Sequence, residues 1–475
     1  MYSRLEAFPL PRELTPTDVR AFAALSKAVE PDSSGELSLD ILASLLFYSA
    51  GVTREKTFPG GTVYFRAAAC AGALYPIEVY AVCGGISDLQ PGVYHFSPGD
   101  FSLRALRAGD YRGALAASAN FNRIATAPVT LVYSALSWRS TWKYRDRAYR
   151  YHYWDNGTVL ANTIAMAHAH CLRHELVMGF VDSDVNDLIG VDGAREFALS
   201  LLPIGESING DNSVGVPAVE RLQLETVPLS ECEVEYPSIE QMHRASALTT
   251  LKEVAEWQRS MVPCGPTSGA SQPLATRLLE PLSEAELPRD AIEHVIERRA
   301  STRRFARKPI SFAELSTIVE RSIVPVAGAR FCSISAVYFI ANDVDGLEPG
   351  AYCFNPNLEQ AEPAFELLKK GSFRKEAAYL TLEQDLGGDA SVTFFLMSNV
   401  SQTLNVLGNR GYRVAQMEAG IIGGKMYLAA YALGRGATGL TFYDDDVSAF
   451  FSPRAAEESC MLAVSVGVPG KRPAY

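Results

Sequence analysis

Two segments of the chain are apolar around most of their circumference when they are read with helical periodicity. They cover residues 157–173 and 420–433 and are rich in Ala and Leu. A helix that is hydrophobic on every side is typical of a buried element, here either inside a domain or pressed against another domain. Each segment is followed by a short helical pattern and then by a strand-like apolar run, at residues 200–205 and 462–467.

The same order of landmarks occurs twice. The matching segments are Leu89–Phe96 with Leu347–Phe354, Arg147–Arg150 with Arg410–Arg413, and Gly179–Asp182 with Phe442–Asp445. The offset is 258 residues for the first pair (347 − 89) and 263 for the other two (410 − 147). The first pair predicts a turn followed by a strand, and a repeat on this scale indicates an internal duplication. The predicted fold is therefore two tandem α+β domains, each of roughly 200 residues, that form a pseudo-dimer within one chain.

Residues 236–288 separate the two halves. They contain Pro263–Pro273, a stretch rich in Pro, Gly and Ser that breaks both helical and strand periodicity. We therefore expect a first domain at residues 1–235, a linker or extended arm at 236–288, and a second domain at 289–475. The length of 475 residues agrees with more than one domain.

Composition narrows the choice of partners. The 43 Lys and Arg against 54 Asp and Glu give a formal net charge of −11, which opposes binding to nucleic acid or to anionic lipid. No apolar run reaches the roughly 18 residues of a membrane span, and the first residues lack a secretion signal, so we expect a cytoplasmic protein. The 8 cysteines form no Cys-X-X-Cys pair and are expected to be mostly buried thiols.

Candidate chemistry appears at the start of the second half. A predicted helix ends in a cluster of arginines around Ser301, namely Arg298, Arg299, Arg303 and Arg304. Alternate residues of an extended exit from this helix point the same way, so Arg299, Ser301 and Arg303 offer two guanidinium groups and a hydroxyl to a phosphate. A basic turn that is simply solvated explains the cluster equally well.

Several motifs give the chain a resemblance to a known family. Arg299-Ala-Ser-Thr-Arg303 resembles the Arg-X-Ser-X-Arg element of flavin-dependent nitroreductases, which holds the phosphate and ribityl chain of FMN. In the first half, Ala71–Tyr80 resembles the Ser-Ala-Gly-Ala-Leu-Tyr-Pro motif of the SagB-type branch, with Cys70 in place of the usual Ser. Thr141–Arg150 resembles the Lys-Tyr and Arg-Gly-Tyr-Arg motifs of that branch, with Ala148 in place of Gly.

The resemblance implies a flavin site shared between the two halves, with FMN as the cofactor. The second domain would contribute the basic element, the loop after its central helix and residues near the C-terminus: Arg299, Ser301, Arg303, Thr441, Phe442, Lys471 and Arg472. The first domain would contribute a loop of small residues and a Lys-Tyr pair: Cys70, Ala71, Gly72, Ala73, Leu74, Lys143 and Tyr144.

A fused chain has room for a second, opposite flavin site, but the residues that it requires are missing. Residues 24–36 are acidic and interrupted by Pro31 where a basic element is needed. The second half has residues 328–335 in place of the small-residue loop, and Val406 and Leu407 stand where a Lys-Tyr pair is expected. One composite site per chain is therefore predicted.

Residue type suggests physical roles at the predicted site. The small side chains of Ala71, Gly72 and Ala73 let the backbone approach a flat aromatic ring, and backbone N–H groups there can bond to its edge. Lys143, next to Tyr144, can act as a general base only in its neutral form, which burial or neighbouring cations would favour. A surface lysine without a catalytic role is the alternative.

Two other clusters suggest metal ligation, but we expect no metal at either. His168, His170, Cys171 and His174 include an i, i+4 pair on a predicted helix, a spacing that can ligate zinc. Their place on the central helix favours ordinary core histidines. Asp444–Asp446 suggest a divalent cation, but they fall at a strand-to-helix junction, where an N-cap role is expected.

The sequence therefore predicts an FMN-dependent oxidoreductase of the SagB type, which acts on a small-molecule or peptide-borne substrate such as an azoline-like heterocycle. Lys143 with Tyr144 would remove a proton from a carbon next to a C=N group while hydride passes to the flavin. The alternatives are a nitro or quinone reductase that uses NAD(P)H, and a catalytically inactive flavin-binding protein. Oligomerisation beyond the pseudo-dimer is left open.

Overall fold

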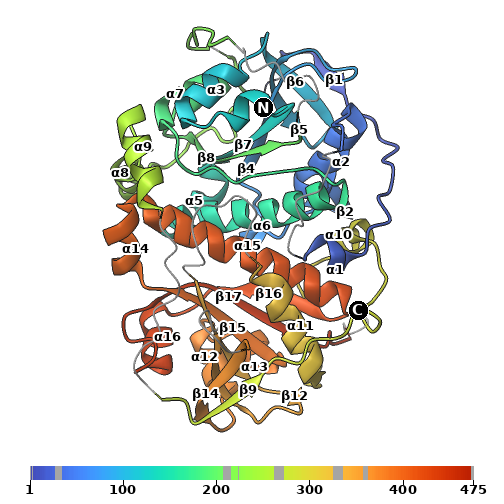
Figure 1. Ribbon diagram of the computed structural model, residues 1–475, viewed down its shortest axis with the longest axis vertical. Coiled ribbons are helices and arrows are strands. Elements are labelled where there is room, and N and C mark those ends of the chain that lie inside the picture. Colours follow the sequence, from blue (N-terminus) through green and yellow to red (C-terminus); the bar gives the residue numbers. More distant parts are fainter. Residues whose placement is uncertain are drawn as a thin grey trace.

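The computed structural model describes residues 2, 4–26, 35–206, 215–222, 224–261, 272–324, 335–356 and 362–471. Two α+β units lie one above the other, and two long helices, α6 (Ala148–Ala169) and α15 (Arg410–Ala432), pack between them (Figure 1). Each unit is built on one antiparallel sheet. The predicted fold of two tandem α+β domains is therefore confirmed.

The first unit has a six-stranded sheet with the order β1-β6-β5-β4-β7-β8. Its strands are β1 (Ala7–Pro9), β4 (Ile77–Cys83), β5 (Gly92–Ser97), β6 (Ser102–Ala108), β7 (Val129–Leu136) and β8 (Glu196–Ile204). Its helices are α1 (Ala21–Ala24), α2 (Leu39–Ala50), α3 (Arg112–Ala119), α4 (Arg123–Thr126), α5 (Trp138–Tyr144) and α7 (Asp182–Ile189), besides α6. Because strand side chains alternate, Val79 and Ala81 of β4 join the core of α2 and α6, whereas Tyr80 and Val82 join that of α3 and α7.

The second unit has a seven-stranded sheet with the order β16-β17-β15-β11-β13-β14-β9. Its strands are β9 (Ala275–Leu278), β11 (Ala336–Ala341), β13 (Gly350–Asn355), β14 (Ala364–Lys370), β15 (Val392–Ser398), β16 (Gly436–Leu440) and β17 (Ser459–Gly467), and a small parallel pair is formed by β10 (Ile310–Ser311) and β12 (Val344–Asp345). Its helices are α10 (Ile292–Arg298), α11 (Phe312–Ser322), α12 (Arg374–Leu380), α13 (Asp385–Asp389), α14 (Val400–Leu407) and α16 (Asp444–Phe451), besides α15. The segments Leu89–Phe96 and Leu347–Phe354, each predicted to be a turn followed by a strand, contain most of β5 and β13.

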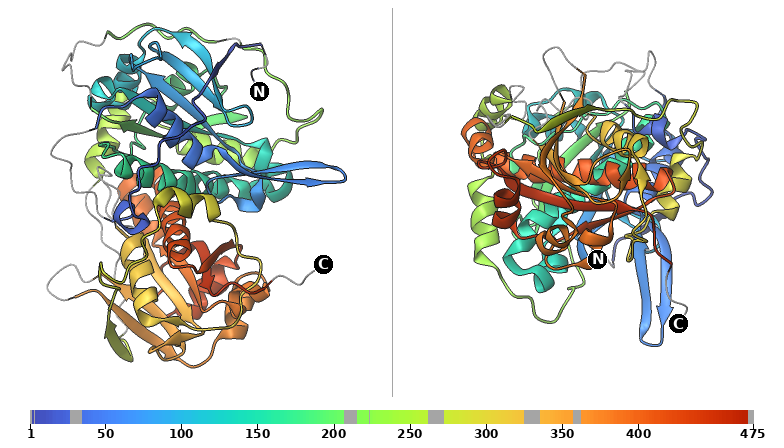
Figure 2. Two further views of the ribbon diagram at one scale, coloured as in Figure 1. Left: turned by 90° about the vertical axis from the view of Figure 1, so that its right-hand side faces the viewer. Right: turned by 90° about the horizontal axis from the view of Figure 1, so that it is seen from below.

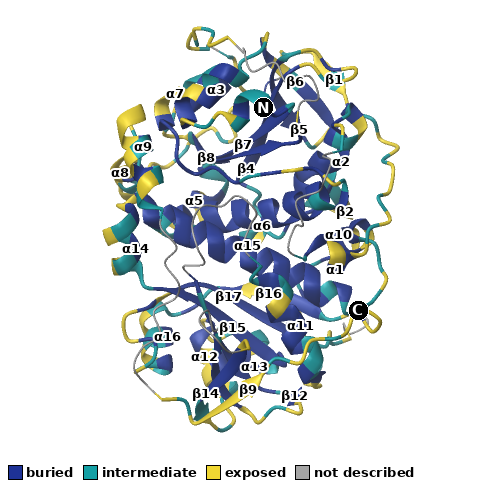
Figure 3. Ribbon diagram, viewed as in Figure 1, coloured by how far each residue is buried: buried dark blue, intermediate teal, exposed yellow. Residues whose placement is uncertain are grey.

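The central helices are buried along most of their length (Figure 3), but they begin earlier than predicted. The structure extends them to Ala148 and Arg410, so that Gly157 and Gly420 lie inside the helices. Both glycines stand where the two helices cross, and a Cβ atom on Gly157 would lie 2.6 Å from the Cα of Gly420. Close packing of the helices, rather than a helix boundary, therefore accounts for these glycines.

Residues 236–288 fold against both units. They form α8 (Pro237–Ala245) and α9 (Leu251–Ser260), and Gln258 on α9 donates to the carbonyl of Ala119 at 2.8 Å. Further along, β9 pairs with β14 at the edge of the second sheet. Most of the Pro-, Gly- and Ser-rich stretch lies outside the described residues. The segment expected to be a linker or arm thus supplies secondary structure to each side.

The starts of the two units exchange backbone hydrogen bonds. Ala21 N–H donates to the carbonyl of Asp290, and Ile292 N–H donates to that of Val19, both at 2.9 Å. The N-termini of α1 and α10 are therefore joined reciprocally, as a pseudo-two-fold relation between the halves requires.

Ion pairs between the two units follow the same pseudo-two-fold relation. They are Arg147 and Arg150 with Asp444 (2.8 and 2.5 Å) and Arg410 and Arg413 with Asp182 (2.6 and 2.7 Å). Asp444 is the first residue of α16, whose N-cap residue makes no side-chain cap bond. The N-cap role expected at Asp444–Asp446 is therefore wrong, because the Asp444 carboxylate pairs with arginines of the other unit.

A two-stranded hairpin, β2 (Val52–Phe58) and β3 (Gly61–Arg66), projects from the first unit beyond the sheets (Figure 2). The side chains of Phe58 and Tyr64 are exposed on it. Its base contacts the second unit, because the guanidinium of Arg54 donates to the carbonyl of Arg299.

The cysteines in the described part of the chain are all free. Cys83, Cys353 and Cys460 are buried and Cys70 is partly buried, but Cys171 and Cys232 are exposed. Half of the described cysteines are therefore buried, and two are exceptions to the expectation that most are buried thiols. None of the helices that the structure describes is long and apolar enough to cross a membrane.

Candidate functional site

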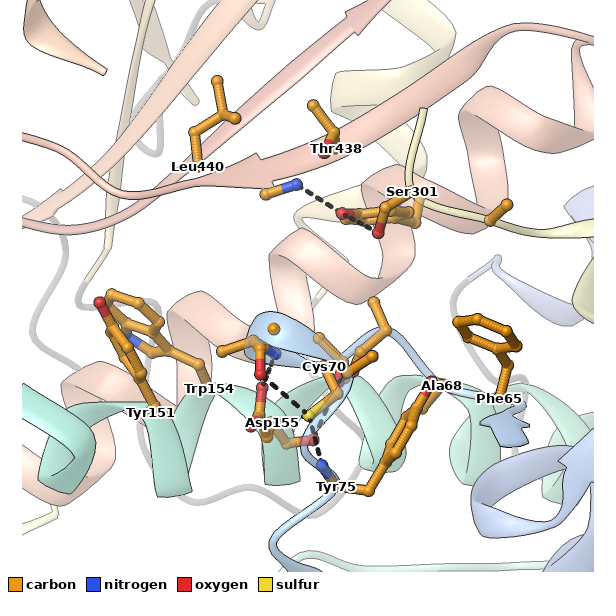
Figure 4. Close-up of a pocket in the computed structure, with 18 of the residues that line it drawn as sticks. Phe65, Ala68, Cys70, Tyr75, Tyr151, Trp154, Asp155, Ser301, Thr438 and Leu440 are labelled. Carbon is orange, nitrogen blue, oxygen red and sulfur yellow. Dashed lines mark hydrogen bonds between the residues drawn. The ribbon is translucent and has the colours of Figure 1, made fainter. Parts of the chain in front are cut away.

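A cavity of about 680 Å³ lies between the two units (Figure 4). The first unit lines it with the β2–β3 hairpin, the loop before β4, α5 and α6, and the second with the exit of α10, α15, β16 and β17. This volume is typical of small-molecule and cofactor sites. The sequence-predicted residues that line it are Cys70, Ala71, Gly72, Ala73, Lys143, Tyr144, Arg299, Ser301, Arg303 and Thr441.

The small-residue loop makes a tight turn in the cavity wall. The 3-10 turn η1 (Ala71–Ala73) has a left-handed backbone at Gly72 (φ 63°) and at Ala73 (φ 55°). A Cβ atom on Gly72 would lie 2.5 Å from the Oη of Tyr144 and 2.9 Å from the Nζ of Lys143. Glycine is therefore needed both for this backbone conformation and for the close approach of the two side chains. The structure brings the predicted loop and the predicted Lys-Tyr pair together.

Asp155 on α6 holds this loop. Its Oδ1 accepts from the N–H of Ala71 at 2.8 Å, and its Oδ2 accepts from the thiol of Cys70 at 3.1 Å (Figure 4). The same sulfur accepts from the N–H of Tyr75 at 3.0 Å. Asp155 is not among the residues predicted for the site, although an acidic residue inside an apolar helix is a detectable signal, since buried carboxylates need partners.

Burial changes the protonation of these groups. It raises the pKa of Asp155 to about 7, because the hydrogen bonds from Ala71 and Cys70 only partly offset the loss of hydration. Burial also raises the pKa of the Cys70 thiol, and the neighbouring Asp155 carboxylate adds to this effect. Burial, with the nearby Tyr151, raises the pKa of Tyr144 to about 12. Cys70 and Tyr144 are therefore protonated hydrogen-bond donors at neutral pH.

The Lys143 side chain extends into the cavity from the last turn of α5. Its Nζ lies 5.1 Å from the ring centroid of Tyr144, and it makes no hydrogen bond or ion pair within the described residues. Earlier in the same helix, Arg139 donates to the carbonyl of Tyr75 at 3.1 Å and to the buried carboxylate of Glu78. These bonds tie α5 to β4, so the position of Lys143 is set by the first sheet.

The basic element leaves α10 in an extended conformation, and the N–H of Thr302 donates to the carbonyl of Ala437 at 2.9 Å. Arg299 is buried, and its Nε and Nη2 donate to the carbonyls of Ala67 (2.9 Å) and Arg66 (3.3 Å) in the first unit. Arg299 therefore joins the two units, a role that the sequence did not predict.

Ser301 and Arg303 differ from Arg299 in their partners. The Oγ of Ser301 lies 3.4 Å from the Oη of Tyr427, which in turn accepts from the N–H of Gly439. The side chain of Arg303 is exposed at the cavity and has no hydrogen bond or ion pair within the part of the chain that the structure describes. An unpaired guanidinium of this kind is free to bind an anion.

Three of the described residues predicted for the site are not among those that line the cavity. Phe442 is buried behind it, with its ring 5.9 Å from that of Trp154. Leu74 follows the lining loop, and Lys471 is exposed near the end of the described chain. Arg472 lies outside the described residues.

Comparison with known proteins agrees with the duplicated fold. The family model described as the nitroreductase family matches residues 50–206 and 296–468, which together make up more than half of the 475 residues. The chain belongs to the nitroreductase family. One matched region falls in each α+β unit, so each half of the chain resembles a complete family domain.

Some similar proteins match less than half of this chain, and others match nearly all of it. A nitroreductase-like protein of Methanocaldococcus jannaschii is 30% identical over 183 residues, which are 38% of this chain and 87% of that protein. The crystal structure of a nitroreductase-like protein from Anabaena variabilis has a TM-score of 0.78 at 24% identity and covers 99% of this chain and 93% of its own. That similarity shows a shared fold over the whole length. A shorter crystal structure from Ralstonia eutropha covers 44% of this chain and 92% of its own, at 20% identity and a TM-score of 0.34.

In this member of the nitroreductase family, α9 fills the position opposite the cavity. Leu407 is the counterpart of Tyr144 (407 − 144 = 263), and its carbonyl accepts from the indole N–H of Trp257 at 2.9 Å. A Cβ atom on Gly179 would lie 2.7 Å from the Trp257 ring. An aromatic side chain thus occupies space beside the position where a second Lys-Tyr pair would stand. The basic element and the small-residue loop were expected to be missing at residues 24–36 and 328–335, and most of both segments lies outside the described residues.

The histidines of the predicted cluster have local partners. Because α6 ends at Ala169, His170 and His174 do not share a helix. His170 Nε2 lies 3.2 Å from the Oγ of Ser44, and His174 Nδ1 lies 3.1 Å from the carbonyl of Leu172. Within the described ranges, no group of three or more His, Cys, Asp or Glu is arranged to hold a metal ion.

Proposed function

We propose that this protein is an FMN-dependent oxidoreductase with one composite flavin site per chain, formed by the cavity between the two units. The observation that carries the proposal is the presence of complementary features on opposite sides of one cavity. Arg303 of the second unit is a cation without a partner among the described residues, and Gly72 of the first unit is at the centre of the small-residue loop Ala71–Ala73. A phosphate needs the first feature and a flat ring needs the second.

The residues present fit a flavin. Ala71, Gly72 and Ala73 line one side of the cavity, and Gly423 and Gly439 line it from the second unit. A Cβ atom on Gly423 would lie 2.5 Å from a methyl group of Leu462, so this wall has no space for a larger side chain. Arg303 with Ser301 would hold the phosphate, and the backbone of the small-residue loop would line the ring.

When bound, FMN supplies a two-electron acceptor for hydride. The contribution of the chain itself is proton transfer. The Nζ of Lys143 would accept the proton from a carbon next to a C=N group, while a neighbouring carbon loses hydride and a double bond forms between the two carbons. Tyr144, which burial keeps protonated, can donate a hydrogen bond to the reacting group. This is the SagB-type reaction, with an azoline-like heterocycle, free or carried on a peptide, as the substrate and oxygen or another acceptor taking the electrons.

A nitro or quinone reductase that uses NAD(P)H is the second candidate. Membership of the nitroreductase family, and the names of its relatives, favour it. In that reaction hydride enters from the nicotinamide, and no base is needed to remove a proton from the donor carbon.

The two candidates are separated with the purified full chain. Released flavin is quantified by chromatography, and a ratio of FMN to chain near one is expected. The holoprotein is then given a thiazoline peptide with oxygen, and separately NADPH with a nitroarene. Turnover of the first supports the SagB-type reaction, and turnover of the second alone supports the reductase. A ratio near two contradicts the single site, absence of flavin contradicts the cofactor, and a flavin-loaded protein inert to both is a flavin binder without catalysis.

A further inference from the structure

Asp155 lies directly behind the loop that the proposed function assigns to the flavin ring, with only 4% of its surface exposed. We propose that Asp155 is a positioning residue: its carboxylate fixes the Cys70–Ala73 loop and places a negative charge behind it that controls how readily the bound flavin is reduced. The inference rests on the proposed FMN site and adds a residue that sets the ratio of reduced to oxidised flavin bound there.

The loop needs an external anchor. Left-handed backbone at a residue with a Cβ atom, as at Ala73, costs roughly 1 kcal/mol or more and persists only where surrounding contacts enforce it. Asp155 supplies two acceptors for consecutive residues of the loop, the thiol of Cys70 and the N–H of Ala71. One turn further along α6, Thr158 Oγ1 donates to the carbonyl of Ala69 at 2.6 Å. The helix therefore holds the loop on both sides of Cys70.

The Asp155 carboxylate has no cation in contact with it among the described residues, and the cations Lys143, Arg299 and Arg303 line the same cavity. Asp155 makes no ion pair within the described residues, and the titratable groups that feel its charge are Cys70, Tyr144 and Tyr151, which are all neutral acids at pH 7. In a buried setting such a charge acts over a longer range than in water. A reduced flavin carries more negative charge than an oxidised one, so an ionised Asp155 opposes reduction. Because burial raises the pKa of Asp155 to about 7, the effect grows as the pH rises through neutrality.

The other half of the duplication carries a counterpart. Glu418 on α15 stands 263 positions after Asp155 (418 − 155 = 263). It is buried, and it accepts from the Oγ of Ser335 at 2.5 Å. Glu418 is not among the residues that line the cavity. The duplicated carboxylate is therefore a matched control that shares the burial of Asp155 but not its place behind the small-residue loop.

The test compares Asp155→Asn, Asp155→Ala and Glu418→Gln in the full-length holoprotein. The FMN dissociation constant is measured by fluorescence, and the ratio of reduced to oxidised flavin is measured against a reference dye at pH 6 and pH 8.5. Asp155→Asn should keep the FMN affinity within about threefold and raise the ratio of reduced to oxidised flavin about tenfold at pH 8.5, roughly 30 mV for a two-electron couple, with little change at pH 6. Asp155→Ala should also weaken FMN binding about tenfold. Glu418→Gln should match the wild type in both.

Other results overturn the inference. If Asp155→Asn keeps the wild-type redox ratio at both pH values, the charge has no part, even if Asp155→Ala binds FMN weakly. If Glu418→Gln shifts the ratio equally, the effect is general to buried carboxylates.

A wild-type protein without flavin contradicts the proposed function instead, and a flavin-independent measurement then tests the contact between Asp155 and Cys70. Removing the carboxylate lowers the pKa of Cys70, so alkylation of Cys70, followed by peptide mass spectrometry at pH 8, should accelerate severalfold in Asp155→Asn. An unchanged rate contradicts the contact itself.

Discussion

Gly157 of α6 and Gly420 of α15 face each other where the two central helices cross, so that a Cβ atom on Gly157 would lie 2.6 Å from the Cα of Gly420. A Cβ atom on Gly420 would in turn lie 2.9 Å from the Cα of Trp154. The same helices carry Asp155 and Gly423 in the cavity walls. The helix crossing therefore sets both the contact between the units and the width of the cavity.

Gly157→Ala should destabilise the protein by roughly 3 kcal/mol, because the new methyl group meets backbone atoms that cannot move independently. The free energy of unfolding from a denaturant titration measures this. Gly60→Ala, at an exposed position in the β2–β3 turn with no atom within 4 Å of the new Cβ, is the control and should stay within about 0.5 kcal/mol of the wild type. Equal stability of all three proteins would show that the helices can separate freely.

Arg303→Ala should weaken FMN binding by roughly 10- to 100-fold, because a charge-assisted contact to phosphate is lost. Fluorescence titration of the flavin-free protein measures the dissociation constant. Arg304→Ala is the matched control, since Arg304 is an adjacent exposed arginine that does not line the cavity. Similar losses in both variants would mean that general positive charge, rather than the unpaired Arg303, attracts the phosphate.

Lys143→Ala should retain FMN and lose about 10²–10⁴-fold in turnover of a thiazoline substrate, the usual contribution of a general base. Reduction of its flavin by NADPH should be nearly unchanged, because hydride transfer from a nicotinamide needs no base. Stopped-flow absorbance follows both reactions. Loss of both activities would assign Lys143 to flavin binding, and loss of neither would favour the reductase.

Asp182→Asn should cost about 3–5 kcal/mol of stability at pH 7, because it leaves Arg410 and Arg413 buried without their counter-ion. Although burial opposes it, the two arginines lower the pKa of Asp182 to about 2. The folded pKa thus lies below the ordinary value of 3.8, so the ionised form stabilises the fold above about pH 4. This contribution, about 2 kcal/mol, is lost as the pH falls toward 2.

The difference in unfolding free energy between wild type and Asp182→Asn should therefore narrow below pH 4, as measured by denaturant titrations at several pH values. Asp444→Asn, in the half-exposed counterpart of this cluster, should cost less than about 1 kcal/mol. A difference that is independent of pH would contradict the ion-pair account.

Trp257→Ala should destabilise the protein by roughly 3–5 kcal/mol, because a buried aromatic side chain is removed from between Gly179 and Leu407. The ratio of FMN to chain should stay near one, because Val406 and Leu407 still replace a Lys-Tyr pair. Flavin chromatography of the variant decides the point. A ratio that rises toward two would show that α9 blocks a site that is otherwise intact.

Local patterns in the sequence predicted those parts of the molecule that depend on residue type and order. Apolar periodicity and the repeated Arg-X-X-Arg segments were enough to predict the duplication, the pseudo-dimer and the two central helices. The start of each helix was misplaced because Gly157 and Gly420 resemble boundary residues when the partner helix is unknown. The 236–288 segment was expected to be a linker because its Pro-rich centre masks the amphipathic α9 beside it.

The sequence by itself determined the duplication and the residue types that are available to the cavity, since both follow from composition and spacing along one chain. Only the tertiary structure decided which groups are partnered. Arg299 and Arg303 are alike in sequence, yet Arg299 donates to carbonyls of the other unit, whereas Arg303 has no partner in the part of the chain that the structure describes. Asp155 anchors the Cys70 loop from a helix about 80 residues away in the chain. Hydrogen bonds and burial depend on distances in space between segments that are remote in sequence, and these distances are set by the packing of α6 against α15.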